Sequence, residues 1–296
     1  MNLIDEIKIS FKQGNSLTRL IYINLGVFLG IKIVQIFFFL FNTPEGSESF
    51  IRWLAVPSNL SELIRKPWTV LTYMFVHEGF LHILFNLLWL FWFGKIFLEY
   101  LDQKKLVGVY ILGGLSGAFL YIFSFNVFPV FGSIATESIA IGASASVIAI
   151  VIAISVYVPD YTVYLLFLGP VKIKYIAILI FVFTSVLDFS TNTGGKIAHI
   201  GGALFGFIYT RQYRKGTDIS KGLSQILDRF LSFFKPKVKL KVKYKRPVND
   251  MEYNKMKARE QEEINQILDK ISKAGYDSLT REEKEILFKM GEKNKN

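Results

Sequence analysis

One segment of the chain forms a long apolar run, Phe80-Leu81-His82-Ile83-Leu84-Phe85-Asn86-Leu87-Leu88-Trp89-Leu90-Phe91-Trp92-Phe93-Gly94-Lys95-Ile96-Phe97-Leu98. A helix of this length spans roughly 28 Å, close to the ~30 Å hydrocarbon core of a bilayer. Polar and ionisable groups are costly in hydrocarbon, so those that occur there are candidate functional residues. His82 and Asn86 are two such groups, and their spacing of four residues places them on one face of the helix.

Similar apolar runs recur along the chain. Of 296 residues, 51% are hydrophobic and 16% aromatic, a composition too apolar for a soluble domain of this size. The sequence predicts an all-α polytopic membrane protein, a six-transmembrane-helix bundle with a small cytoplasmic helical tail. The six predicted spans are about Leu20–Phe41, Phe80–Leu98, Leu106–Phe125, Ile141–Val158, Tyr175–Leu187 and Ile197–Thr210.

The connecting segments predict the orientation. An even number of spans places both termini on one side, and the Lys and Arg residues near the span ends are more numerous on that side. By the positive-inside rule both termini are cytoplasmic. The segment Asp160–Lys174 contains Gly169-Pro170 and is expected to be a loop. The segment Asn42–Gly79 is long for a connector, which predicts a partly structured outer loop.

The net charge of +11 divides the chain into segments. From Arg211 onward there are 22 Lys and Arg against 13 Asp and Glu, so the basic character belongs to the tail. We expect a cytoplasmic leader (1–19), a six-span domain (20–211), an amphipathic and basic juxtamembrane segment (212–249) and a helical module (250–296). The lysines within residues 235–246 predict contact with anionic lipid head groups rather than nucleic acid. The partner of the C-terminal module is left open.

Two further polar groups lie in apolar runs. Ser144 follows Gly142 at the start of the fourth span, where a helix N-terminus would offer N–H groups to an oxyanion. His199 opens the sixth span and could serve as the base that activates a serine. Both spans look short, which predicts that Ser144 and His199 face a wet cavity open to the outer side. A Ser–His dyad fits better than a triad, since Asp188 alone is a carboxylate close to His199 in sequence.

Other chemistries compete for these residues. Three histidines could hold a metal ion, but His77 and His82 are five residues apart, which is poor spacing for a shared helical face. The absence of cysteine excludes thiolate chemistry. Ser146 is a second possible nucleophile, roughly 200° around the helix from Ser144. No cofactor is expected.

Three motifs occur in a fixed order along the chain. They are His77-x4-His82-x3-Asn86, then Gly142-x-Ser144, then Ala198-His199-x-x-Gly202-x-x-x-Gly206. Together they closely resemble the rhomboid intramembrane serine proteases over roughly residues 15–212.

The resemblance implies a role for each of these groups. Ser144 would be the nucleophile and His199 the base, with His82 and Asn86 in the oxyanion hole and His77 supporting the first loop. Gly142 and Gly202 would support the backbone geometry of the site. The substrates would be membrane proteins with a transmembrane helix, and the location a bacterial inner membrane.

The chain departs from the family pattern at three positions. Ala145 follows the serine where glycine is frequent, Ile148 stands where a tyrosine often stacks on the histidine, and Thr69 replaces an arginine of the first loop. The rival interpretation is a catalytically inactive rhomboid-like scaffold that binds transmembrane helices. A small-molecule transporter would predict internal repeats, which the sequence does not show.

Overall fold

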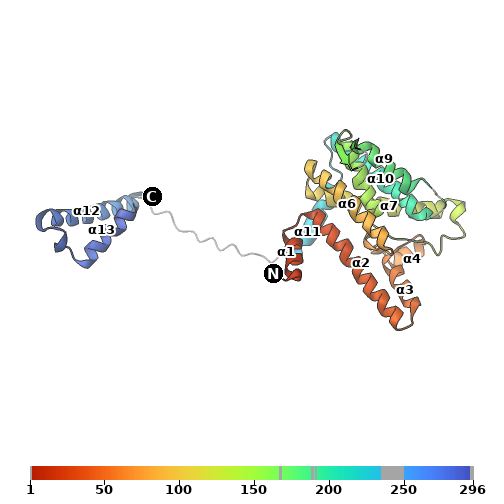
Figure 1. Ribbon diagram of the computed structural model, residues 1–296, viewed down its shortest axis with the longest axis horizontal. Helices are drawn as coiled ribbons and strands as arrows, with labels where there is room; N and C mark the ends of the chain where they lie inside the picture. Colours follow the sequence, from red (N-terminus) through yellow and green to blue (C-terminus); the bar gives the residue numbers. More distant parts are fainter. Residues whose placement is uncertain (1, 167–168, 188–189, 191, 235–249, 294–296) are drawn as a thin grey trace. The chain divides into compact units, whose positions relative to one another are not determined.

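The computed structural model describes residues 2–166, 169–187, 190, 192–234 and 250–293. Two compact units divide the chain, one over residues 1–235 and the other over residues 236–296 (Figure 1). In the first unit the long helices are α2 (Ser16–Leu40), α6 (Phe80–Tyr100), α7 (Gln103–Val127), α8 (Ser144–Tyr157), α9 (Ile173–Ser185) and α10 (Thr193–Arg214).

Shorter elements connect and flank these helices. The loop between α2 and α6 holds α3 (Pro44–Leu54), β1 (Val56–Pro57), α4 (Leu60–Arg65), α5 (Thr69–Thr72) and η1 (Tyr73–Phe75), so it is partly structured as expected. The other short elements of this unit are α1 (Leu3–Gln13), η2 (Pro129–Phe131), β2 (Ile139–Ala140), β3 (Thr162–Leu165), β4 (Gly169–Lys172) and α11 (Lys221–Phe234).

Each predicted span coincides with a helix. Among the described residues, α2, α6 and α7 are long and apolar enough to cross a membrane, whereas α8 and α9 are shorter apolar helices. The crossing count of six therefore stays a prediction. The expectation of a short sixth helix was wrong, because α10 has 22 residues rather than about 14. Its first and last turns are polar and basic, so the apolar run marks only its middle, and the Asn192 side chain caps its start.

The segment Asp160–Lys174, expected to be a loop, is a connection between α8 and α9 that contains a short β-hairpin. Strands β3 and β4 pair antiparallel in this segment, with Thr162 opposite Lys172 and Leu165 opposite Gly169. Gly169 has a φ of +70°, a left-handed conformation that glycine adopts without strain. A second small sheet pairs β1 with β2 and so connects the loop between α2 and α6 to the segment just before α8. The fold is thus mostly helical, with two small sheets.

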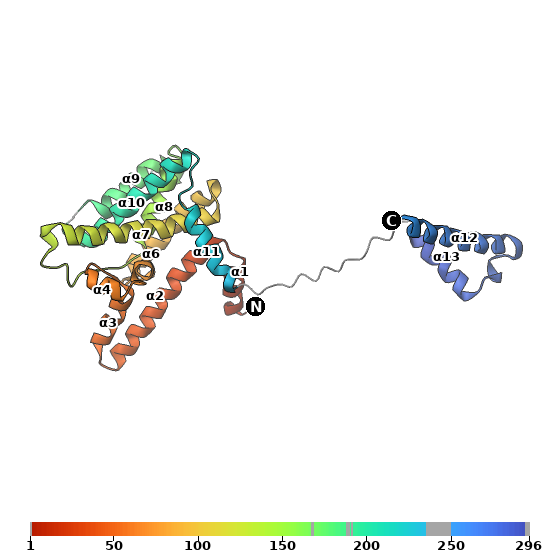
Figure 2. The same ribbon diagram turned by 180° about the vertical axis from the view of Figure 1, so that it is seen from behind.

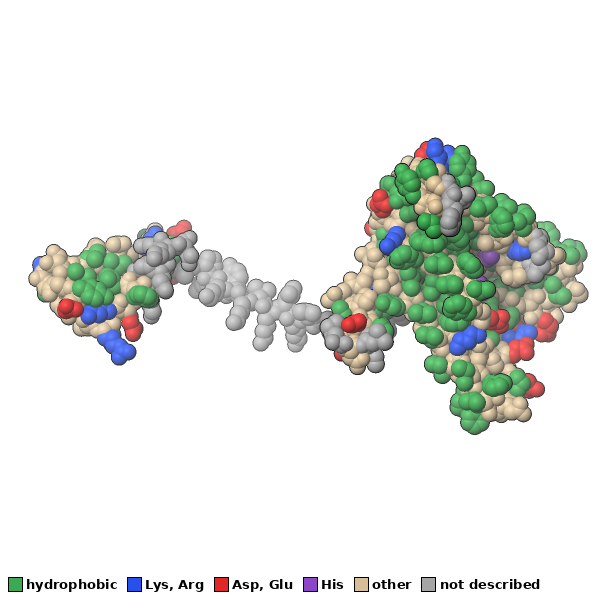
Figure 3. Space-filling view, viewed as in Figure 1, with side chains coloured by type: hydrophobic (Ala, Val, Ile, Leu, Met, Phe, Trp, Pro, Cys, Tyr) green, Lys and Arg blue, Asp and Glu red, His purple; other side chains and the backbone are tan. Residues whose placement is uncertain are grey.

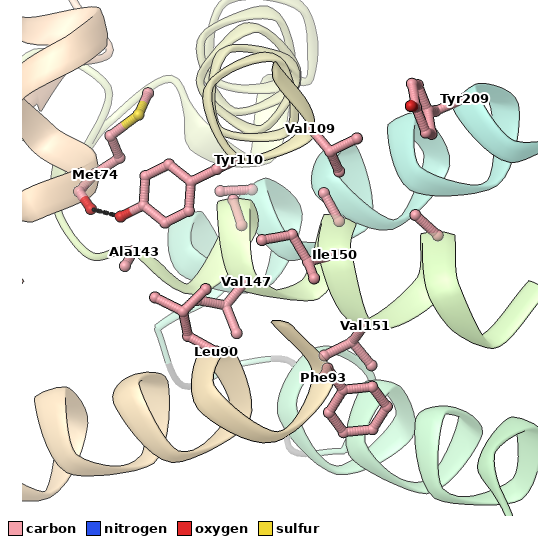
Figure 4. Packing of buried hydrophobic residues seen from close by; sticks show 14 of the residues in the cluster. Met74, Leu90, Phe93, Val109, Tyr110, Ala143, Val147, Ile150, Val151 and Tyr209 are labelled. Atoms are coloured by element: carbon pink, nitrogen blue, oxygen red, sulfur yellow. Dashed lines mark hydrogen bonds between the residues drawn. The ribbon is translucent and has the colours of Figure 1, made fainter. Parts of the chain in front are cut away.

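Helix α8 lies at the centre of the bundle and packs against α6, α7, α9 and α10 (Figure 2). Its side chains Val147, Ile150 and Val151 belong to the main hydrophobic core together with Leu90 and Phe93 of α6 (Figure 4). Ten of its residues are buried. This central position holds the start of α8 in place from several sides.

Glycines let α7 and α10 approach α8 closely. A Cβ atom at Gly113 or Gly117 of α7 would lie 2.3 Å from the Ala149 Cβ or 2.6 Å from the Ala145 Cβ. On α10, a Cβ at Gly202 would lie 2.1 Å from the Ala145 carbonyl oxygen. The small-xxx-small pattern permits such backbone proximity in membranes. Ala145, a departure from the family pattern, and Ala149 are therefore both in close contact with α7 and with α10.

The outer surface of the first unit carries many apolar side chains (Figure 3). Phe39 and Leu40 of α2 are 81% and 72% exposed, and Phe183 of α9 is 63% exposed. Such large exposed apolar areas are found where a protein meets lipid or a partner. On helices of this apolarity the surface indicates contact with the bilayer.

The second unit is a helical hairpin of α12 (Asp250–Ala274), η3 (Tyr276–Ser278) and α13 (Arg281–Lys293). Ile267 and Leu279 are buried in it, and Lys270 forms an ion pair with Glu283. Thr280 and Glu283 form a capping box at the start of α13. The basic segment 235–246, for which lipid contact is predicted, lies within residues 235–249 and outside the described part of the chain.

Candidate active site

Ser144 is the first residue of α8, where the chain turns sharply from β2 into the helix. Gly142 has a φ of +121°, which side-chain-bearing residues rarely adopt. Its N–H donates to the Tyr73 carbonyl at 2.9 Å. A Cβ at this position would also lie 2.9 Å from the imidazole of His82. The turn therefore requires glycine for two reasons, its backbone angle and the lack of space for a side chain beside His82.

His77 supports the same turn from the loop between α2 and α6. The side chain is fully buried, and its Nε2 accepts the N–H of Ala143 at 3.4 Å. Its Nδ1 lies 3.2 Å from the Phe75 carbonyl, to which it donates. Burial, reinforced by the nearby His82, lowers the pKa of His77 from 6.5 to about 4. His77 is thus a neutral bridge that joins the loop to the residue before Ser144.

The serine and the histidine meet at hydrogen-bond distance. His199 Nε2 lies 2.6 Å from the Ser144 Oγ, although the two residues are 55 positions apart in sequence. His199 is not at the outer end of its helix, as its span predicted, but six residues after the first residue of α10. At 1.5 Å per residue this places it ~9 Å along the helix axis from the start of α10. His199 therefore lies within a long helix rather than at its end.

The pair opens into a cavity of about 370 Å³. Helix α6 contributes His82 and Asn86 to its lining, so the two polar residues of the opening stretch reach the same space as Ser144 and His199. Asn86 Nδ2 donates to the His82 carbonyl at 3.0 Å, which uses one of its two hydrogens. The remaining lining residues are Leu81, Phe85, Trp89, Ile141, Val147, Ile148, Val151, Ile180, Thr184, Asn192 and Gly195.

Ser146, Ile148 and Thr69 lie in three different environments. Ser146 is buried with its Oγ toward the sulfur of Met74 at 3.9 Å, on the far side of α8 from the cavity lining. Ile148 is buried and lines the cavity where the family often has a tyrosine. Thr69 is buried and its hydroxyl donates to the Lys66 carbonyl, so it caps a turn of the first loop.

The structure adds groups that the sequence did not indicate. The Thr184 carbonyl at the end of α9 lies 3.0 Å from the His199 Nδ1. Asn192, with a φ of +51°, caps α10 and lines the cavity. A backbone carbonyl has no side-chain signature, so no sequence motif could have pointed to Thr184. Asp188, the carboxylate considered for a triad, lies outside the described residues.

The part of the chain that the structure describes gathers no group of three or more His, Cys, Asp or Glu side chains that could hold a metal ion. The three histidines are instead engaged with backbone groups, with each other and with Ser144. His77 and His82 stack edge to face with ring centroids 5.1 Å apart. The arrangement suits acid–base chemistry at a serine hydroxyl.

Comparison with known proteins gives the family. The model of the Rhomboid domain matches residues 65–215, which is half of the chain and includes every site residue named above. The chain belongs to the rhomboid family. It is accordingly an integral membrane protein, and its relatives are named as proteases. A second model, a family of unknown function (DUF6576), matches residues 249–292 of this rhomboid, the segment of the C-terminal hairpin.

Curated relatives match a limited part of the rhomboid domain. A rhomboid protease GlpG from Pectobacterium atrosepticum is 31% identical over 87 residues, covering 29% of this chain and 31% of the relative. Another from Klebsiella pneumoniae subsp. pneumoniae is 31% identical over 98 residues, covering 33% and 35%. The chain thus spans about a third of the length of the curated relatives it matches.

Proposed function

We propose that this rhomboid is an intramembrane serine endopeptidase that cleaves transmembrane segments of other membrane proteins. The observation that carries the proposal is the 2.6 Å contact between Ser144 Oγ and His199 Nε2 inside a cavity bounded by membrane helices. A serine hydroxyl is a poor nucleophile until a base accepts its proton, and a neutral imidazole is suited to that role.

The reaction would proceed in two steps. Ser144 Oγ attacks the peptide carbonyl while its proton passes to His199 Nε2, and the imidazolium then protonates the leaving amine. Water repeats the sequence on the acyl-enzyme and regenerates the serine. The oxyanion would be held by the first N–H groups of α8, which have no intrahelical partner, and by the side chains of His82 and Asn86.

The test compares two serines of one helix. Ser144→Ala in liposomes with a single-span substrate is expected to abolish cleavage, by at least about 10³-fold. Ser146→Ala is the matched control, since its hydroxyl lies against Met74 rather than in the cavity, and cleavage should persist. Cleavage by the Ser144 variant would reject the nucleophile. If the wild type binds several single-span substrates and cleaves none of them, the inactive scaffold is the better assignment.

A further inference from the structure

His199 is held at both ring nitrogens, and the two contacts together define its protonation. Nδ1 lies 3.0 Å from the Thr184 carbonyl and Nε2 lies 2.6 Å from the Ser144 Oγ. A carbonyl oxygen only accepts hydrogen bonds, so Nδ1 carries the hydrogen. The Nε2 of the neutral ring then presents a lone pair, and Ser144 donates to it. The Thr184 carbonyl therefore selects the tautomer that a general base requires.

The position of Thr184 explains why its carbonyl is available. Helix α9 ends at Ser185, and the last four carbonyls of a helix have no partner within that helix. The C-terminal end of a helix also carries a partial negative charge, which stabilises a nearby cation. An imidazolium forms on His199 when it accepts the serine proton. The end of α9 is thus placed to favour both the resting tautomer and the charged intermediate state of His199.

A second donor of α10 fixes the same end of α9. Lys196, one helical turn before His199, donates to the Leu187 carbonyl at 2.7 Å. The Thr184 side chain bonds back to the Ile180 carbonyl at 2.8 Å, and Ser185 is fully buried. Basic side chains commonly satisfy the last carbonyls of a helix in this way. Two residues of α10 therefore bind backbone carbonyls at the last turn of α9 and just after it.

We propose that the Thr184 carbonyl is a positioning group that does for His199 what a carboxylate does in a catalytic triad. In a triad the third group holds the imidazole in the correct tautomer and orientation and stabilises the imidazolium. Here a helix C-terminus supplies the acceptor and the negative potential. The catalytic meaning of this assignment rests on the proposed function, whereas the tautomer itself does not.

The experiment weakens one backbone carbonyl at a time. Replacing Ser185 by the corresponding α-hydroxy acid converts the Thr184–Ser185 amide into an ester, whose carbonyl is a weaker acceptor. The matched control replaces Val186 in the same way, which weakens the Ser185 carbonyl and likewise removes one amide N–H from this turn. Because the chain has only three histidines, ¹⁵N NMR of histidine-labelled protein resolves each ring, and His199→Asn identifies the signal of His199.

We expect native His199 to be protonated at Nδ1. The ester at residue 185 should lower that tautomer's population and reduce kcat about tenfold, with KM changed less than about threefold. The control ester should leave the tautomer unchanged. A native His199 protonated at Nε2, or an ester that alters neither tautomer nor kcat, would overturn the proposal.

A side-chain variant gives an independent measurement if the ester protein does not fold. Lys196→Met removes the bond between α10 and the Leu187 carbonyl just after α9 while leaving the His199 side chain in place, and it should lower the Nδ1–H population of His199. An unchanged tautomer in Lys196→Met would argue against positioning by the end of α9. Since the NMR signal does not depend on cleavage, a protein with the expected tautomer and no proteolysis would reject the proposed function alone.

Discussion

At the scale of single residues, the site is built by using backbone groups as partners for side chains. His77 bonds to the Phe75 carbonyl and the Ala143 N–H, and His199 bonds to the Thr184 carbonyl. Buried polar groups need such partners, because an unsatisfied group costs about 1–3 kcal/mol. The backbone is thus part of the site.

The neutral bridge at His77 predicts a pH dependence of stability. The pKa of this histidine is about 4 in the folded protein and 6.5 ordinarily. Between these values the unfolded chain binds a proton that the folded chain does not, so the free energy of unfolding falls as the pH falls from 6.5 to 4. His77→Gln does not titrate and should lose this part of the pH dependence.

The measurement is the thermal unfolding temperature in detergent between pH 4 and pH 7. The wild type should lose more stability over this interval than His77→Gln, by on the order of 1–3 kcal/mol in the free energy of unfolding. His82 and His199 are present in both proteins, so the difference between the two curves reports the loss of His77 together with its contact to His82. Parallel curves would show that His77 is not held neutral.

At the scale of elements, the central question is how a helix as short as α8 is held in place. Its 14 residues span ~21 Å, less than a ~30 Å hydrocarbon core. Two flanking helices compensate by close backbone contact, with Gly113 and Gly117 of α7 on one side and Gly202 and Gly206 of α10 on the other. Ser144 is therefore positioned by helix packing rather than by the ends of a long span.

Gly202→Ala should disrupt this packing. The new Cβ would lie 2.1 Å from the Ala145 carbonyl oxygen, a backbone atom that cannot move without α8. We expect a loss of about 1–3 kcal/mol in the free energy of unfolding and a strong reduction in cleavage. The measurements are thermal unfolding and cleavage of a single-span substrate in liposomes.

The matched control is Gly30→Ala in the middle of α2, where a Cβ would meet nothing within 4 Å. Alanine is the better helix former, so this variant should be as stable as the wild type or more stable by up to about 1 kcal/mol. Equal behaviour of the two variants would show that the close contact between α10 and α8 is not needed for stability.

At the scale of the whole molecule, charge predicts the orientation. The Lys and Arg residues concentrate in the tail and in the connections assigned to the inner side. Since the chain has no cysteine, single cysteines report accessibility without background. Ser133→Cys lies in an exposed connection between α7 and α8, and Ser272→Cys is exposed in the C-terminal hairpin.

We expect a membrane-impermeant maleimide to label Ser133→Cys in intact cells. Ser272→Cys should be labelled only after the cells are lysed, because both termini are predicted to be cytoplasmic. The reverse pattern would invert the orientation and place the opening of the active-site cavity on the inner side. Labelling of both sites in lysed cells is the control for reactivity.

The apolar helices and the order of the site motifs follow from the amino-acid sequence alone. Hydrophobic runs are local properties, so the regions of α2, α6 and α7 were predicted closely. The residues His82, Asn86, Ser144 and His199 were singled out because polar groups are rare in apolar runs, and the structure brings all four to one cavity. The motifs also indicate the family without any information on geometry.

The groups that support these residues are known only from the tertiary structure. Hydropathy does not predict the polar ends of α10 or the β3–β4 hairpin, because both form through hydrogen bonds in segments that are not uniformly apolar. Hydropathy does not indicate the Thr184 carbonyl either, since every residue has a carbonyl and only the packing of the helices shows which one contacts His199. The candidate site side chains are therefore indicated by their positions in apolar runs, whereas the groups that support them follow from the contacts between helices.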